Sequence, residues 1–172
     1  DDRRRYMNAR KTFEALLAQG VIPVVNENDT ISTDEIKFGD NDKLSALVAG
    51  MVEADLLLIL SDVEGLYKFE GDQKILFKEV KEITADIESL ACGTSKKQIS
   101  KGGMSAKLAA IKIALNAKVP CVIAHGEVKN VLERVLAGER IGTFFMEKEE
   151  KLLSKKHWIS FGARPKGMLV ID

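Results

Sequence analysis

Four short apolar runs, separated by longer stretches of helical periodicity, constrain this chain more than any other feature. The runs occupy residues 21–25, 56–60, 120–124 and 142–146, and Val, Ile and Leu dominate the first two. Continuous apolar runs of this length are typical of strands buried on both faces of a parallel sheet. Strands that alternate with helices form βαβ units, so the sequence predicts an α/β fold with a mainly parallel sheet.

Helical periodicity accounts for most of the remaining chain. Apolar side chains recur at helical spacing before Gly20, in residues 41–53, in residues 104–117 and in residues 128–136. A Gly-containing turn predicts a hairpin within residues 67–80, and a short helix is expected at residues 86–90. The polar, glycine-bearing stretch of residues 93–103 predicts a mobile loop.

Composition excludes several classes of protein. The 172 residues, 45% of them hydrophobic, suffice for about one domain with a sizeable core. Because 26 basic residues balance 26 acidic ones, no global field attracts nucleic acid or a membrane surface. No signal peptide or membrane-length apolar run is present, so a cytoplasmic location is expected. Cys92 and Cys121 lie far apart, which indicates neither a disulfide framework nor a zinc site.

An acidic, amide-rich segment follows the first apolar run. It extends over residues 26–42 and contains six acidic side chains and three asparagines. Open α/β sheets bind ligands outside the carboxyl ends of their strands, which places Asn26 and Asp29 at such a crevice. Asn41 and Asp42 stand at the start of the next helix. The same residue types also make ordinary turns and helix caps, so local spacing supports both interpretations.

Two further segments have the chemistry of a nucleotide site. Ser61 and Asp62 follow the second apolar run, where they could bind a nucleotide or simply cap a turn. A second helix start combines two glycines with two lysines, in the run Lys101, Gly102, Gly103, Met104, Ser105, Ala106 and Lys107. Such a helix start favours a phosphate, although an ordinary glycine-opened helix fits the same residues. Neither a Walker A sequence nor GxGxxG is present. His125 and His157 have no partner at a catalytic spacing and are interpreted as structural.

Four motifs together resemble the amino acid kinase family. They are NEND at residues 26–29, IKFGDNDKLSA at 36–46, SDVEGLY at 61–67 and GGMSAK at 102–107. The resemblance covers almost the whole chain, and NEND followed by GDND is similar to the branch that phosphorylates glutamate. It implies a three-layer αβα sandwich with a mainly parallel sheet, here without the family's N-terminal lobe.

The resemblance also implies roles on the substrate side of the site. By similarity, Asp29 and Asn41 would bind L-glutamate, and Asn26 would line the same pocket. Asp42 would orient the catalytic lysines.

On the nucleotide side, the resemblance implies that Ser61 and Asp62 contact ATP and that residues 101–107 wrap its phosphates. Lys107 would stabilise the transferring phosphoryl group. Lys101 stands where the family pattern has threonine, so a charge replaces a hydroxyl there.

The implied activity is ATP-dependent phosphorylation of the γ-carboxylate of L-glutamate to glutamyl 5-phosphate, the first step of proline biosynthesis. It implies ATP and Mg²⁺, feedback inhibition by proline, and a homo-oligomer. The alternatives are another amino acid kinase, of the acetylglutamate kinase or aspartokinase type, and a non-catalytic module that senses an amino acid.

The expected organisation is that of one piece of a longer protein. Residues 1–150 are expected to form the C-terminal, nucleotide-binding portion of a kinase domain. Residues 151–172, with Trp158, Gly162 and Pro165, resemble a linker toward a PUA module. The family's N-terminal lobe, which carries a further catalytic lysine and a glycine loop, has no counterpart here, so the chain alone is expected to be inactive.

Overall fold

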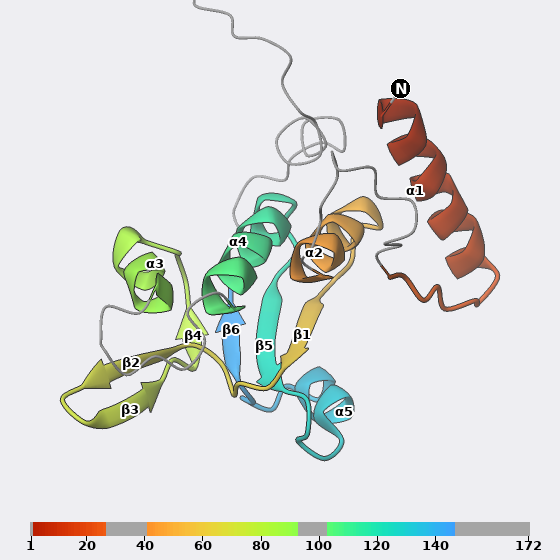
Figure 1. The fold of residues 1–172 in the computed structure, drawn as a ribbon. Coiled ribbons are helices and arrows are strands. Elements are labelled where there is room, and N and C mark those ends of the chain that lie inside the picture. Colours follow the sequence, from red (N-terminus) through yellow and green to blue (C-terminus); the bar gives the residue numbers. More distant parts are fainter. Residues whose placement is uncertain (1, 27–40, 93–102, 147–172) are drawn as a thin grey trace, which may run out of the picture.

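The computed structural model describes residues 2–26, 41–92 and 103–146, which form a mixed α/β structure (Figure 1). The main sheet has four strands in the order β1-β5-β6-β4, and β2 and β3 form a separate hairpin. The strands are β1 (Leu57–Ser61), β2 (Tyr67–Glu70), β3 (Gln73–Leu76), β4 (Glu79–Val80), β5 (Cys121–His125) and β6 (Thr143–Phe145). The helices are α1 (Asp2–Ala18), α2 (Asn41–Met51), α3 (Ala85–Cys92), α4 (Gly103–Asn116) and α5 (Val131–Leu136).

The sheet is mainly parallel, as the sequence predicts. β1 pairs in parallel with β5, with Leu57 opposite Cys121 and Ser61 opposite His125. β4 pairs in parallel with β6, whereas β5 and β6 are antiparallel. The carboxyl ends of β1 and β5 therefore lie together at one edge of the sheet.

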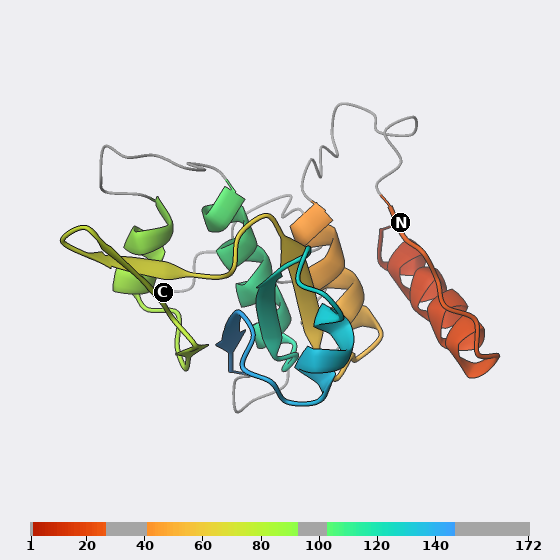
Figure 2. The ribbon, with the colours of Figure 1, turned by 90° about the horizontal axis from the view of Figure 1, so that it is seen from below.

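Helices cover both faces of the sheet, which gives three layers (Figure 2). Strand side chains on one face, such as Ile59 and Ile123, join the core that α2 and α4 bury. Their neighbours on the other face, such as Val122 and Ala124, pack with Val131 of α5. This alternation follows from the period of two in a strand, and each fully buried aliphatic side chain contributes about 1.5–3 kcal/mol.

Helix boundaries follow local backbone geometry. At the end of α1, Val21 N–H donates to Leu16 O at 3.0 Å and Gly20 N–H to Leu17 O at 3.0 Å. These two bonds form a Schellman motif, and Gly20 has the left-handed φ of 72° that the motif requires. The helix predicted for residues 128–136 begins only at Val131, because Asn130 is left-handed with φ 56°.

The strand predicted for residues 21–25 is wrong in this structure. These residues have no regular structure, and Ile22 and Val24 are 85% and 96% exposed. A strand needs a hydrogen-bonded neighbour, and β1 is paired only with β5 in the part of the chain that the structure describes. The βαβ unit expected between residues 21–25 and β1 is therefore absent from the described residues.

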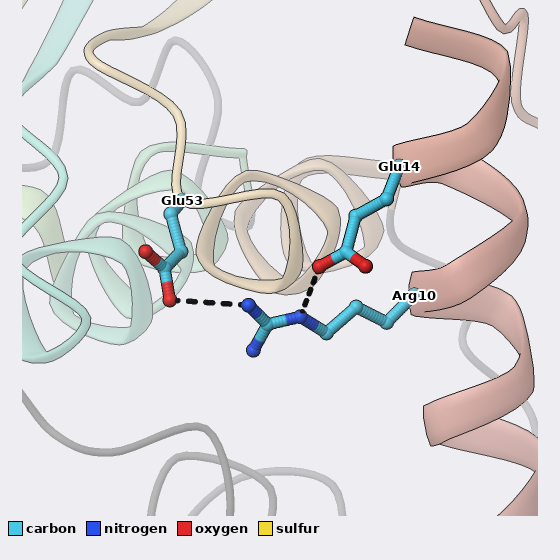
Figure 3. A network of polar contacts seen from close by, with 3 residues as sticks. All are labelled: Arg10, Glu14 and Glu53. Carbon is cyan, nitrogen blue, oxygen red and sulfur yellow. Dashed lines mark hydrogen bonds and ion pairs between the residues drawn. The ribbon is translucent and has the colours of Figure 1, made fainter. Parts of the chain in front are cut away.

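α1 contacts the turn that follows α2 through a polar network (Figure 3). Arg10 Nε donates to Glu14 Oε1 at 2.7 Å, and Arg10 Nη2 lies 3.3 Å from Glu53 Oε1. The hydrogen bond to Glu14 is the largest of the effects that raise the pKa of Arg10. Both acidic partners are about half exposed, and exposed ion pairs contribute little to stability. These two ion pairs therefore contribute little to the stability of the fold.

Of the remaining predicted segments, the structure describes the hairpin but not most of the polar loop or the C-terminal segment. The hairpin is confirmed, with Glu70 opposite Gln73 across a two-residue turn in which Gly71 has φ 61°. The loop expected at residues 93–103 lies outside the described residues except for Gly103, and residues 151–172 lie outside them entirely. None of the described helices has the length and apolar character needed to cross a membrane.

The reactivity of the Cys121 thiol tests whether this residue lies in the core. Burial raises the pKa of its thiol to about 12, and the side chain is 0% exposed. Because only the thiolate reacts, alkylation by iodoacetamide at pH 8 should be at least about 10³-fold slower in the native protein than in guanidinium chloride. Peptide mapping by mass spectrometry measures this rate. Equal labelling under both conditions would contradict the placement of Cys121 in the core.

Candidate functional site

The candidate site lies at the edge of the sheet where β1 and β5 end. α2 precedes β1 in the chain and α4 precedes β5, so both helices run back across the sheet and begin at this edge (Figure 1). Asn41 and Asp42 are the first residues of α2, and Gly103 is the first residue of α4. The free N–H groups of two helix starts and the ends of two strands therefore share one region of the molecule.

One ion pair joins the two helix starts. Lys107 Nζ donates to Asp42 Oδ2 at 2.8 Å across 65 positions of sequence. The two side chains are only 16% and 20% exposed. At this distance and burial, the charge-assisted bond restricts the lysine ammonium to one position more firmly than a surface pair would.

The other residues predicted in this region sit on the same two helix starts. Asn41 is exposed to solvent at the first position of α2. On α4, Gly103 is exposed, Ser105 and Ala106 are half-buried, and Met104 packs against the core. The packing of Met104 holds the first turn of α4 against the core, and Lys107, at the start of the next turn, reaches Asp42.

Ser61 and Asp62 occupy the end of β1. Ser61 Oγ donates to Asp62 Oδ1 at 3.0 Å, and Gly126 N–H donates to Ser61 O at 2.8 Å. The second bond ties the end of β1 to the chain just after β5. The backbone at Ser61 is thereby fixed, while Asp62 begins a turn at the edge.

The turn after Asp62 leads to Tyr67, whose hydroxyl donates to the carboxylate of Glu64. Desolvation, followed by this hydrogen bond, raises the pKa of Tyr67. Lys74 Nζ lies 3.6 Å from the centroid of the Tyr67 ring, a cation–π contact across the hairpin. The start of the hairpin is therefore held through one side chain, by a hydrogen bond from the Tyr67 hydroxyl and a cation over the Tyr67 ring.

The structure does not test every predicted site residue. Asp29, Lys101 and Gly102 lie outside the described residues. Asn26 is described and is exposed in a segment without regular structure. His125 Nδ1 accepts a hydrogen bond from Glu127 N–H at 3.2 Å, a local contact in the turn after β5.

Sequence reasoning missed one residue that bears on this region. Thr143 in β6 is fully buried and accepts a hydrogen bond from Leu66 N–H at 2.9 Å. The adjoining Gly142, with φ 79°, marks an unusual backbone position. A glycine beside a threonine in a short apolar run was the available signal, but nothing in the run indicates the partner 77 residues away.

The arrangement suits the binding of an anion more than acid–base chemistry. It combines two helix starts and a held ammonium, which are groups that bind phosphates. No group of three or more His, Cys, Asp and Glu residues that could hold a metal ion is found in the described ranges.

Comparisons with known proteins give a consistent result. Residues 1–125 match the model of the amino acid kinase family. The chain is 50% identical over 173 residues to the glutamate 5-kinase of Carboxydothermus hydrogenoformans. It is 49% identical over 175 residues to the glutamate 5-kinase of Dictyoglomus turgidum. Each match covers 99% of this chain and 46% of the relative, so the chain spans about half the length of these curated relatives.

A solved structure supports the fold. The UMP kinase of Bacillus anthracis matches with a TM-score of 0.56 and 17% identity, over 84% of this chain and 53% of that one. At this identity the likeness concerns the three-layer architecture alone.

Proposed function

The chain belongs to the amino acid kinase family, and from this premise we propose that its protein transfers the γ-phosphate of ATP to the γ-carboxylate of L-glutamate. The product is glutamyl 5-phosphate, the first intermediate of proline biosynthesis. The observation that carries the proposal is the identity of about half of all aligned positions with proteins named glutamate 5-kinase, along 99% of this chain. The named motifs at residues 26–29, 36–46, 61–67 and 102–107 support it.

The proposed reaction is an in-line displacement at phosphorus. A carboxylate oxygen of glutamate forms a bond to the γ-phosphorus, the bond from that phosphorus to the bridging oxygen breaks, and ADP leaves. The carboxylate is already ionised at neutral pH, so no residue needs to remove a proton from it. Catalysis then depends on positioning and on cations that face the equatorial oxygens.

We propose that part of this machinery lies among the described residues. We assign Lys107 to the transferred phosphoryl group, with Asp42 holding its ammonium at 2.8 Å. Ser61 and Asp62, with residues 101–107, are assigned to the nucleotide, and Asp29, Asn41 and Asn26 to glutamate. Mg²⁺ is expected to arrive with ATP, since kinase sites hold it through phosphate oxygens, water and one or two carboxylates. When bound, it would neutralise phosphate charge.

The proposal extends to the organisation of the whole protein. This chain would be the C-terminal, nucleotide-binding portion of the kinase domain, with residues 151–172 leading toward a PUA module. Proline as feedback inhibitor, a homo-oligomer and a cytoplasmic location complete the proposal.

The choice of acceptor tests the proposed function directly. The full-length protein should release ADP with L-glutamate at least about tenfold faster than with N-acetylglutamate or aspartate at equal concentration. A coupled ADP assay measures these rates. A preference for N-acetylglutamate or aspartate would replace the proposal with one of the other kinase types, and binding of glutamate without ADP release would indicate a sensing module. The 172-residue chain alone should show no activity, because it spans only 46% of the length of the glutamate 5-kinases that it matches.

Replacing Lys107 with Met tests whether its ammonium stabilises the transferred phosphoryl group. The Lys107→Met change should lower kcat by about 10²-fold or more, with much smaller changes in either KM, because the interaction is made mainly in the transition state. Steady-state kinetics on the full-length protein measure both constants. Lys112→Met is the matched control, since Lys112 lies on the same helix in a half-exposed pair with Glu88. Wild-type kcat in Lys107→Met would contradict the assignment.

The Asp29→Asn change tests the substrate pocket. Free glutamate carries an α-ammonium, and a charge-assisted bond to a carboxylate contributes about 1.5–3 kcal/mol. The change should therefore raise the KM for glutamate by roughly 10- to 100-fold and leave the KM for ATP nearly unchanged. Glu27→Gln is the comparison, because Glu27 offers the other nearby carboxylate. If the glutamate KM responds to Glu27→Gln and stays within about twofold in Asp29→Asn, the pairing belongs to Glu27.

A further inference from the structure

Thr143 is a buried polar residue in a strand that carries none of the predicted site residues. Its side chain is 0% exposed, and no other polar residue that the structure describes is buried to this degree. A hydroxyl in such a position is costly unless it is hydrogen-bonded. The bonds that it makes therefore indicate what it does.

Both bonds of the hydroxyl reach segments far away in sequence. Thr143 Oγ1 accepts from Leu66 N–H at 2.9 Å and donates to Phe77 O at 2.6 Å. Phe77 N–H in turn donates to Leu66 O at 2.8 Å. Leu66, Phe77 and Thr143 thus form a closed set of three bonds at the base of the hairpin, between β1 and β4.

Two glycines make room for this contact. Gly65 has φ 151°, and a Cβ on it would overlap Thr143 Oγ1. Gly142 has φ 79°, and a Cβ on it would overlap Ile123 O of β5. L-residues rarely adopt either conformation, so only glycine lets β6 approach β5 while Thr143 reaches the turn.

The hydrogen bond from Leu66 to Thr143 restricts the turn that follows β1. Its first end is fixed where Gly126 N–H binds Ser61 O, and its second end is fixed where Leu66 N–H binds Thr143. Asp62 and three further residues lie between these anchors, and Leu66 itself is 1% exposed. A four-residue turn held at both ends has little freedom to move its first residues.

We propose that Thr143 is a positioning residue for the nucleotide: its hydroxyl fixes the turn of residues 62–65 so that Ser61 and Asp62 meet ATP. This inference rests on the proposed function, through the assignment of these two residues to the nucleotide. Thr143 acts through the turn and touches no substrate. Its loss would therefore weaken the binding of ATP and leave the acceptor side unchanged.

The test compares hydroxyl-bearing and hydroxyl-free side chains in the full-length protein. Thr143→Val keeps the shape and removes both bonds, whereas Thr143→Ser keeps the hydroxyl and removes a methyl group. Thr143→Val should raise the Kd for ATP, measured by calorimetry without acceptor, by about tenfold or more, and Thr143→Ser should stay within about threefold of wild type. The KM for glutamate should change by less than about twofold in both.

Controls separate positioning from general destabilisation. Val131→Ala truncates a buried residue on α5, on the opposite face of the sheet, and should lower stability without changing the Kd for ATP. If Thr143→Val does not fold, Thr143→Cys retains a weak donor and acceptor of similar size and should show the rise in Kd relative to Thr143→Ser.

The outcomes separate the two proposals. Wild-type protein that binds ATP, together with Val or Cys variants that bind it equally well, would overturn the role of Thr143 and leave the proposed function standing. Wild-type protein that fails to bind ATP would overturn both. An equal loss of affinity for ATP in the Ser and Val variants would also overturn the role of Thr143, because the variant that keeps the hydroxyl would then bind no better than the variant that lacks it.

Discussion

β1 and β5 lie side by side in parallel, with Leu57 opposite Cys121 and Ser61 opposite His125, and the rest of the described structure follows from this pairing. Parallel neighbours are joined by a crossover connection that returns the chain to the starting end of the sheet, and α4 is the helix that leads into β5 in this way. α2 leads into β1 in the same direction, and the two helices pack on one face over Ile59 and Ile123. Their first turns consequently lie at the edge where the strands end. The contact between Lys107 and Asp42 is a consequence of topology, since 65 residues separate the two side chains.

Patterns that depend on neighbouring residues were predicted well from the sequence. α4, β5 and the hairpin turn at Gly71 each follow from periodicity or turn chemistry within a few residues. The failures concern features that depend on distant partners. Residues 21–25 have the composition of a strand, but composition does not supply a neighbour to complete a ladder. The left-handed backbone at Asn130 delays α5, and its signal is local, since asparagine adopts this conformation more readily than most residues, but the helical periodicity of residues 128–136 obscures it.

In the candidate site, too, features with a local sequence signal were predicted and features that depend on distant partners were not. The helix starts at Asn41 and Gly103 were recognisable because capping and glycine residues signal them locally. The roles proposed for Asp42 and Lys107 came from resemblance to a family, because spacing alone does not bring them together. For Thr143, the preceding glycine was the local signal, and it indicates an unusual backbone position without indicating a partner. The importance of Thr143 lies in bonds to Leu66 and Phe77 that exist only once β6 has joined the sheet between β5 and β4.

The ion pair between Lys107 and Asp42 has two opposed effects on a phosphate site. A carboxylate beside the ammonium weakens the positive field that a phosphoryl group would meet, yet it also removes the freedom of a long, flexible side chain. Geometry reconciles the two, because an ammonium has three N–H donors and the 2.8 Å bond to Asp42 uses one of them. In the proposed reaction, the other two donors can face phosphate oxygens while the first still holds the lysine in place. The group is then organised before the substrate arrives, so little of the binding energy of ATP is needed to order it.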